Sequence, residues 1–137
     1  MPASRKPSRR AVNLPNRPAG LPFSDAVLDG NTLHISGHIG IDPATGLAPP
    51  EIDRELKLLF DGFSATLAKA GMNWDDLVWV QVFSTDLSLW ERFNADYVKH
   101  FRRDFPARAF LGAALVCNAR FEMMGTAVRA KPHRKGR

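Results

Sequence analysis

The sequence predicts one α+β domain in which a mixed β-sheet carries two helices on one face. Its length of 137 residues suits a single hydrophobic core. Apolar residues make up 45% of the chain and charged residues 24%, which is ordinary for a folded protein. Segments with the two-residue period of strands and the 3.6-residue period of helices follow one another in the order ββ, α, β, α, ββ. This order favours a mixed sheet with the helices together on one side.

A tight hairpin opens the folded part. Residues 25–28 and 32–37 are short, apolar-rich segments of the kind that form strands. Asp29, Gly30 and Asn31, which lie between the two segments, are typical of the turn of a β-hairpin. The first two strands are therefore expected to pair with each other.

Two amphipathic helices follow. From Glu51 to Ala70 apolar residues recur every three or four positions, and Gly71 then suits a helix terminator. Ser88 and Glu91 have the spacing of a capping box, which predicts a second helix from there to about Arg103.

Three more segments have strand character. Residues 77–84 are apolar at successive positions, which indicates an interior strand covered on both faces. Residues 107–116 and 120–130 are expected to form two strands joined by a short link around Asn118 and to lie side by side. Since two helices cover only one face, the other face is expected to meet further copies of the chain.

The net charge of +5 comes from the two ends of the chain. Residues 1–20 hold five basic side chains and residues 129–137 hold five more, whereas residues 21–128 hold nine basic and 14 acidic ones, a net charge of −5. We expect a flexible basic arm over 1–20, a folded domain over 21–130 and a basic tail over 131–137. An acidic domain does not favour nucleic acid as a partner.

Several other classes of protein are not favoured. No apolar run approaches the roughly 18 residues that cross a bilayer, and no signal-peptide pattern is present, so a cytoplasmic location is expected. Cys117 is the single cysteine and is interpreted as a small buried apolar residue. His34 and His38 would lie about 13 Å apart on a strand, too far to share a metal ion. We expect no metal site, and no phosphate-binding loop for a nucleotide cofactor is present.

Arg108 and Glu122 are the charged residues placed within apolar strand segments. A guanidinium among Ala, Phe, Leu and Val is costly unless it meets an anion, and Glu122 lies between Phe121 and Met123. Two interpretations stay open from the residue types. The two side chains form a structural ion pair, or Arg108 binds a substrate carboxylate while Glu122 transfers a proton or activates water.

Spaced motifs over residues 21–130 resemble the RidA/YjgF family of reactive-intermediate deaminases. The motifs, in chain order, are Leu-Pro-Phe-Ser-Asp-Ala-Val (21–27), Ser-Gly-His-Ile-Gly-Ile-Asp-Pro-Ala-Thr-Gly (36–46), Val-Phe-Ser-Thr-Asp-Leu (82–87), Phe-Asn-Ala-Asp-Tyr (93–97), Phe-Pro-Ala-Arg (105–108), Phe-Glu (121–122) and Ala-Val (127–128). Several motifs in the right order are more specific than any one of them.

The resemblance implies a chorismate-mutase-like fold and a homotrimer whose sheets line a central barrel, with clefts between subunits. It implies cofactor-free hydrolysis of 2-imino and enamine acids to 2-keto acids and ammonia. Arg108 matches the arginine that binds the substrate carboxylate, and Glu122 matches the glutamate that positions or activates water. Asn94 matches an asparagine near the cleft, and Gly37 and Phe110 fall where backbone amides line the pocket.

Two positions depart from the family pattern. Phe23 stands where many members have tyrosine, so a hydroxyl donor is missing, and Phe110 replaces a smaller residue. A different imine substrate is one consequence. A binding or interaction module that uses the cleft without turnover is the alternative, and an endoribonuclease is a third hypothesis, less favoured because the domain is acidic.

Overall fold

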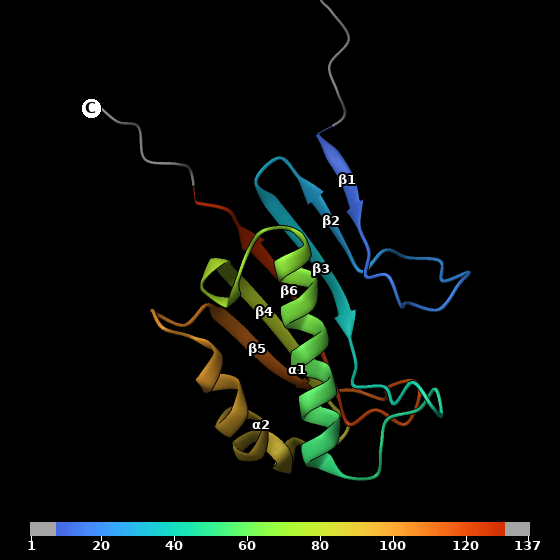
Figure 1. Cartoon of the computed structure of the whole chain (residues 1–137). Helices are drawn as coiled ribbons and strands as arrows, with labels where there is room; N and C mark the ends of the chain where they lie inside the picture. Colours follow the sequence, from blue (N-terminus) through green and yellow to red (C-terminus); the bar gives the residue numbers. More distant parts are fainter. Residues whose placement is uncertain (1–7, 131–137) are drawn as a thin grey trace, which may run out of the picture.

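A mixed sheet of six strands carries two helices on one of its faces (Figure 1). The structure is a computed structural model, and it describes residues 8–130. The strands are β1 (Arg9–Val12), β2 (Ala26–Asp29), β3 (Thr32–His38), β4 (Leu77–Ser84), β5 (Ala107–Gly112) and β6 (Phe121–Val128), and the helices are α1 (Ile52–Lys69) and α2 (Trp90–Tyr97). The order across the sheet is β1-β2-β3-β6-β4-β5. The predicted α+β class is confirmed.

The two last strands do not pair with each other, contrary to the prediction of neighbouring strands. Strand β4 lies between them, parallel to β5 and antiparallel to β6. The segment from β5 to β6 crosses the end of β4, where Ala113 N donates to Ser84 O and Thr85 N donates to Arg120 O. Strand β5 also ends at Gly112, four residues earlier than predicted, because the chain leaves the sheet for this crossing. The prediction that Cys117 is buried is wrong for the same reason, since Cys117 lies on the crossing segment and is exposed.

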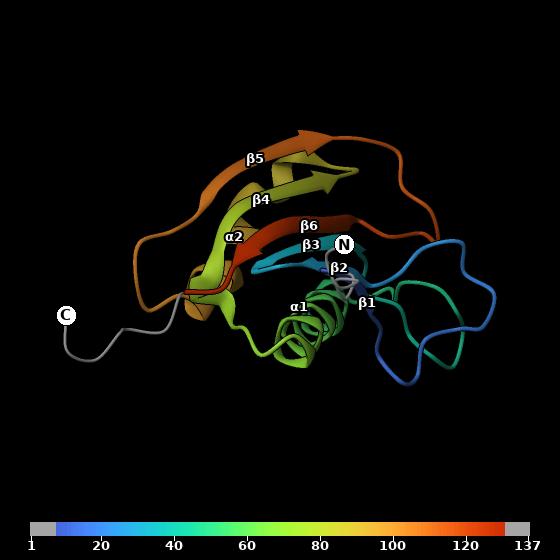
Figure 2. The ribbon, with the colours of Figure 1, turned by 90° about the horizontal axis from the view of Figure 1, so that it is seen from above.

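The hydrophobic core lies between the sheet and the two helices. The view from above shows α1 against one face of the sheet (Figure 2). Helix α1 buries its apolar stripe, which includes Leu56, Leu59 and Phe63, against the sheet. Phe93 of α2 packs against Phe121 of β6, with ring centroids 5.3 Å apart. Both helices therefore cover the same face.

Helix α1 agrees with its predicted bounds to within one residue at each end. Gly71 follows it with a φ of 73°, a left-handed conformation that glycine adopts without strain. The sequence pattern located this helix because its burial follows directly from its apolar spacing.

Helix α2 differs from the prediction at both ends. Ser88 does not cap it, because the Asp86 side chain accepts from Ser88 N and thereby caps a 3₁₀ turn, Leu87–Leu89, ahead of the helix. At the other end a 3₁₀ turn finishes at His100. The amides of Arg102 and Arg103 donate to Asp75 instead of continuing the helix.

The predicted flexible arm is wrong for residues 9–12, which form β1. This strand pairs antiparallel with β2, and Val12 is buried in the core. No strand pattern was visible here because basic residues and prolines surround Val12 in the sequence. Residues 1–7 and the predicted tail over 131–137 lie outside the described residues.

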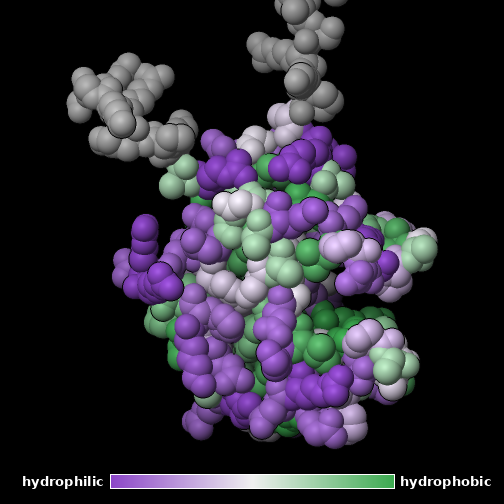
Figure 3. Space-filling model, in the orientation of Figure 1, coloured by the Kyte–Doolittle hydropathy of each residue, from purple (hydrophilic) through white to green (hydrophobic). Residues whose placement is uncertain are grey.

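The outer face of the sheet leaves large apolar side chains exposed in a single copy. Trp79 on β4 is 40% exposed and Leu111 on β5 is 43% exposed. On the opposite, helix-covered side, hydrophilic residues predominate, and hydrophobic ones gather at the lower right, where the loops before α1 and β6 meet (Figure 3). Within residues 8–130 no helix has the length and apolar character to span a bilayer.

Candidate functional site

Arg108 lies near the start of the edge strand β5, on the helix-covered face. It pairs with Val80 of β4, whose side chain is fully buried under the helices. Adjacent paired residues share a face, so the Arg108 side chain points toward α2. Its Cζ atom lies 5.0 Å from the ring centroid of Trp90 and 4.6 Å from that of Tyr97.

The Arg108 guanidinium has no acidic partner within residues 8–130. It is half-buried, and this burial lowers its pKa, partly offset by the nearby Tyr97. Arginine nevertheless stays protonated in proteins. The structural ion pair between Arg108 and Glu122, one of the two interpretations of the sequence, is therefore absent from this chain, and a positive charge remains for an anion.

Asn94, which the family resemblance placed near the cleft, lines the same cleft as Arg108. The cleft also contains Tyr97, which sequence reasoning did not select. Asn94 Oδ1 and Tyr97 Oη are buried without a hydrogen-bond partner among residues 8–130. The three-residue spacing of Asn94 and Tyr97, which places both on one flank of a helix, was the signal available in the sequence.

The hydroxyl of Tyr97 interacts with Arg108 electrostatically. Burial raises the pKa of Tyr97 to about 12, against a smaller lowering by the Arg108 guanidinium. The two groups are close, and because a guanidinium only donates hydrogen bonds, the Tyr97 O–H has no acceptor within residues 8–130. Tyr97 is therefore a neutral donor whose proton is available.

Phe110 belongs to this group as well. It lies two residues after Arg108 on the same face of β5, and the Arg108 Cζ atom is 5.6 Å from its ring centroid. Its ring also packs edge-on against Trp90 and Phe93. Phe110 is thus one of the aromatic rings that surround the Arg108 guanidinium.

Glu122 lies on the opposite face of the sheet. It pairs with Phe83 of β4, whereas its neighbours Phe121 and Met123 are buried on the helix side. The carboxylate makes no ion pair or hydrogen bond with another side chain in the described part of the chain. Burial raises the pKa of Glu122 above the ordinary value of a glutamate.

Gly37 and Phe23 lie on the Glu122 side. Gly37 contacts the Glu122 side chain directly, since a Cβ atom placed on it would lie 1.9 Å from Glu122 Oε2. Phe23 is 51% exposed, and it precedes Ser24, whose carbonyl accepts from the Ser36 hydroxyl at 2.6 Å. This bond holds the Phe23 loop beside β3 next to Gly37.

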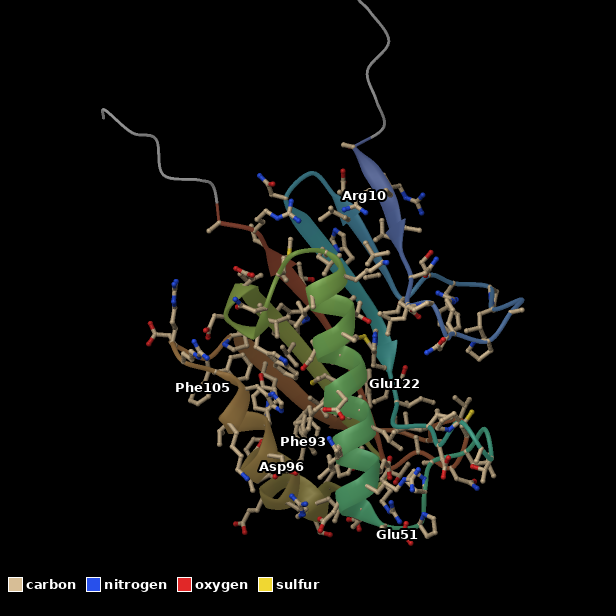
Figure 4. All side chains as sticks on the ribbon, viewed as in Figure 1. Arg10, Glu51, Phe93, Asp96, Phe105 and Glu122 are labelled. Atoms are coloured by element: carbon tan, nitrogen blue, oxygen red, sulfur yellow. The ribbon has the colours of Figure 1, made fainter. Side chains whose placement is uncertain are left out.

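The six predicted residues therefore form two separate groups in one copy of the chain. Arg108 and Phe110 on β5 face α2, which carries Asn94, and Phe23, Gly37 and Glu122 lie toward the other side of the sheet. The Cα atoms of Arg108 and Glu122 are about 14 Å apart, from two interstrand spacings and an offset of three residues. Figure 4 shows Phe105, at the entrance of the Arg108 cleft, and Glu122 on either side of α1.

No cluster of three histidine, cysteine, aspartate or glutamate side chains suited to a metal ion occurs within residues 8–130. His38, at the end of β3, instead uses its two ring nitrogens in bonds to Ser36 O and Thr66 Oγ1.

Residues 14–129 match the family described as Endoribonuclease L-PSP. A 2-iminobutanoate/2-iminopropanoate deaminase of Capra hircus is 35% identical over 88% of this chain and 90% of its own length. The protein of that name from Homo sapiens is 32% identical over the same shares. A RutC family protein of Leuconostoc mesenteroides is 34% identical over 89% of this chain and 99% of its own.

Solved structures show the same fold. A putative endoribonuclease of Thermotoga maritima superposes with a TM-score of 0.80 at 34% identity, covering 89% of this chain and 98% of the other. The YjgF gene product of E. coli gives a TM-score of 0.76 at 29% identity, covering 88% and 99%. A Rid-family protein of Yersinia pestis gives 0.80 at 28% identity, with the same coverage.

Proposed function

The chain belongs to the Endoribonuclease L-PSP family, which corresponds to the RidA/YjgF resemblance of its motifs, and we propose that it hydrolyses 2-imino acids and their enamine tautomers to 2-keto acids and ammonia. One observation carries the proposal. The half-buried Arg108 guanidinium faces a cleft and has no acidic partner within residues 8–130. A planar, desolvated guanidinium binds a carboxylate by two parallel hydrogen bonds.

The proposed reaction adds water across the C=N bond. Glu122, as the carboxylate, takes a proton from water while the oxygen bonds to C2 of the imine in its protonated form, and the electrons of the C=N bond pass to nitrogen, which gives a tetrahedral amino alcohol. Glu122 then gives its proton to the amine. The C–N bond breaks as the hydroxyl proton passes to the Glu122 carboxylate, the 2-keto acid and ammonia leave, and ammonia takes up that proton as ammonium. The raised pKa of Glu122 supports both steps, because it makes the carboxylate a stronger base toward water than an ordinary glutamate.

Arg108 and Glu122 serve one substrate only when they come from different copies of the chain. They face opposite sides of the sheet in one copy, about 14 Å apart at Cα, and a small 2-imino acid does not span that separation. We therefore propose the homotrimer and the inter-subunit cleft that the family resemblance implies. The exposed apolar side chains on the outer face, such as Trp79 and Leu111, support such an assembly.

The test uses imines made in the assay. An L-amino acid oxidase supplies 2-imino acids, and their loss is followed by trapping with semicarbazide and by release of ammonia. The wild-type protein should accelerate hydrolysis, and Arg108→Ala should reduce kcat/KM at least about 100-fold, since two charge-assisted bonds are lost. Arg102→Ala, which removes an exposed arginine outside the cleft, is the control. No acceleration with any 2-imino acid would exclude this function.

A carboxylate-binding module without turnover is the second candidate, because one copy offers Arg108 without Glu122. Thermal stabilisation by 2-keto acids with no hydrolysis of imines would favour it. Cleavage of RNA has less support, since residues 21–128 carry nine basic and 14 acidic side chains.

A further inference from the structure

The Arg108 cleft extends well beyond the guanidinium. It lies between α2 with its following 3₁₀ turn and the start of β5, and its volume is about 270 Å³. The residues that line it are Asn94, Tyr97, Val98, Phe105, Pro106 and Arg108. The carboxylate of a 2-imino acid occupies only the Arg108 end of this space.

Aromatic rings hold the charged end in place. The Arg108 Cζ atom lies between 4.6 and 5.8 Å from the ring centroids of Tyr97, Trp90, Phe110 and Phe93. Cation–π contacts of this kind fix the guanidinium without neutralising it. The positive charge of Arg108 therefore faces the cleft and is surrounded by aromatic rings.

Two unpartnered polar atoms flank the charge. Tyr97 is 4% exposed, and its hydroxyl is a donor without an acceptor, while Asn94 Oδ1 is an acceptor without a donor, within residues 8–130. A buried polar atom without a partner is costly in the empty site and is satisfied by a suitable ligand. A carboxylate accepts from Tyr97, and the N–H of an imine donates to Asn94.

The rest of the cleft is apolar. Phe105 is 59% exposed and Val98 is 44% exposed, and Pro106 lies between Phe105 and the strand. A methyl side chain leaves most of this surface in contact with water, whereas a phenyl or branched side chain covers it. Aromatic side chains also gain from packing against the rings of Phe105 and Tyr97.

We propose that the preferred substrates are 2-imino acids with a large apolar side chain, aromatic ones foremost. This inference rests on the proposed function and names the substrate class at the same site. Arg108 with Tyr97 binds the carboxylate, Asn94 orients the imine nitrogen, and the surface of Val98, Phe105 and Pro106 receives the side chain.

The experiment compares imines that differ only in the side chain. The oxidase generates them from alanine, 2-aminobutyrate, leucine and phenylalanine, and kcat/KM is measured for each with the full-length protein. We expect the phenylalanine imine to exceed the alanine imine by about tenfold or more, since each methylene in an apolar pocket contributes about that factor.

Variants of the cleft then test whether its apolar residues cause the preference for large side chains. Phe105→Ala and Val98→Ala should each lower the ratio of kcat/KM between the phenylalanine and alanine imines by at least about threefold. Val116→Ala is the matched control, because Val116 is a 69% exposed apolar residue on the loop before β6, outside the cleft. It should leave the ratio unchanged. Circular dichroism checks that each variant is folded.

The outcomes separate the two proposals. Hydrolysis of all imines with equal or better kcat/KM for the alanine imine overturns the substrate class and leaves the deaminase proposal standing. Hydrolysis of none overturns the deaminase proposal. Thermal stabilisation then tests the cleft alone: phenylpyruvate should stabilise the protein at lower concentration than pyruvate, and an equal or weaker effect of phenylpyruvate overturns the inference without reference to turnover.

Discussion

Gly37 on β3 leaves room for the side chain of Glu122 on β6, with 1.9 Å between a Cβ atom built on Gly37 and Glu122 Oε2. Real Cβ atoms do not approach other atoms so closely, so any side chain at position 37 displaces the carboxylate. The absence of a side chain at Gly37 thus positions the proposed proton-transfer group.

Gly37→Ala should therefore reduce kcat/KM for imine hydrolysis about 100-fold, because a displacement of about 1 Å at a catalytic group has effects of that size. The control is Gly62→Ala in α1, where a Cβ meets nothing within 4 Å. It should keep full activity and raise the free energy of unfolding by about 0.5–1 kcal/mol. Full activity of Gly37→Ala would show that imine hydrolysis does not depend on the position of the Glu122 carboxylate.

Inactive variants of Arg108 and Glu122 should complement each other when their subunits are mixed. If each site takes Arg108 from one copy and Glu122 from another, random assembly of Arg108→Ala with Glu122→Gln leaves about one quarter of the sites intact. Refolding an equimolar mixture should recover about that share of wild-type activity. Recovery of none, with assembly verified by size-exclusion chromatography, would place both residues in one copy's site.

The pH dependence should follow the raised pKa of Glu122, which burial causes. The folded state binds the proton more readily than the unfolded state, so stability falls as the pH rises through the window between the unfolded and the folded pKa. Glu122→Gln should remove this fall, which urea unfolding at a series of pH values measures. Activity of the wild type should rise over the same window as the base ionises, and a flat activity profile would contradict the proposed role.

His38 should give the opposite trend. Burial lowers its pKa, against smaller raising effects of the bond to Ser36 O and of Asp25. The neutral ring is the folded form, so the contribution of His38 to stability is lost as the pH falls below about 6.5 toward the folded pKa. His38→Gln should reduce the loss of thermal stability at low pH. If that loss is unchanged in the variant, it arises from other groups, such as His100, whose pKa burial also lowers.

The buried carboxylate of Glu55 should matter more for stability than an exposed pair on the same helix. Glu55 is fully buried, and it accepts from Arg120 N at 2.7 Å and from Arg120 Nη1 at 2.6 Å. Glu55→Ala leaves Arg120 without its charge partner and should lower the free energy of unfolding by about 3–5 kcal/mol.

Disrupting the exposed pair of Lys57 and Asp61 with Lys57→Ala is the comparison, because both side chains are more than half exposed. It should change the free energy of unfolding by less than about 1 kcal/mol. Urea denaturation measures both variants, and a comparable loss in the two would contradict a special role for Glu55.

Local pattern in the sequence was sufficient to predict the elements whose burial follows their own periodicity. The apolar stripe of residues 51–70 predicted α1 because its spacing reports one face of a helix. The run of apolar residues at successive positions in 77–84 likewise predicted β4 with its bounds. Charge within apolar segments drew attention to Arg108 and Glu122 because an isolated charge there is costly wherever the chain folds.

Contacts between distant segments decided the rest. The strands that hold Arg108 and Glu122 follow each other in sequence, but β4 separates them in the sheet, and only the pairing register shows that the two side chains face opposite sides. After α2, the amides of Arg102 and Arg103 donate to the side chain of Asp75, which lies 27 and 28 positions earlier in the chain. Tyr97 gained its importance from the unpartnered hydroxyl beside Arg108. Such relationships depend on non-local packing, which local periodicity does not encode.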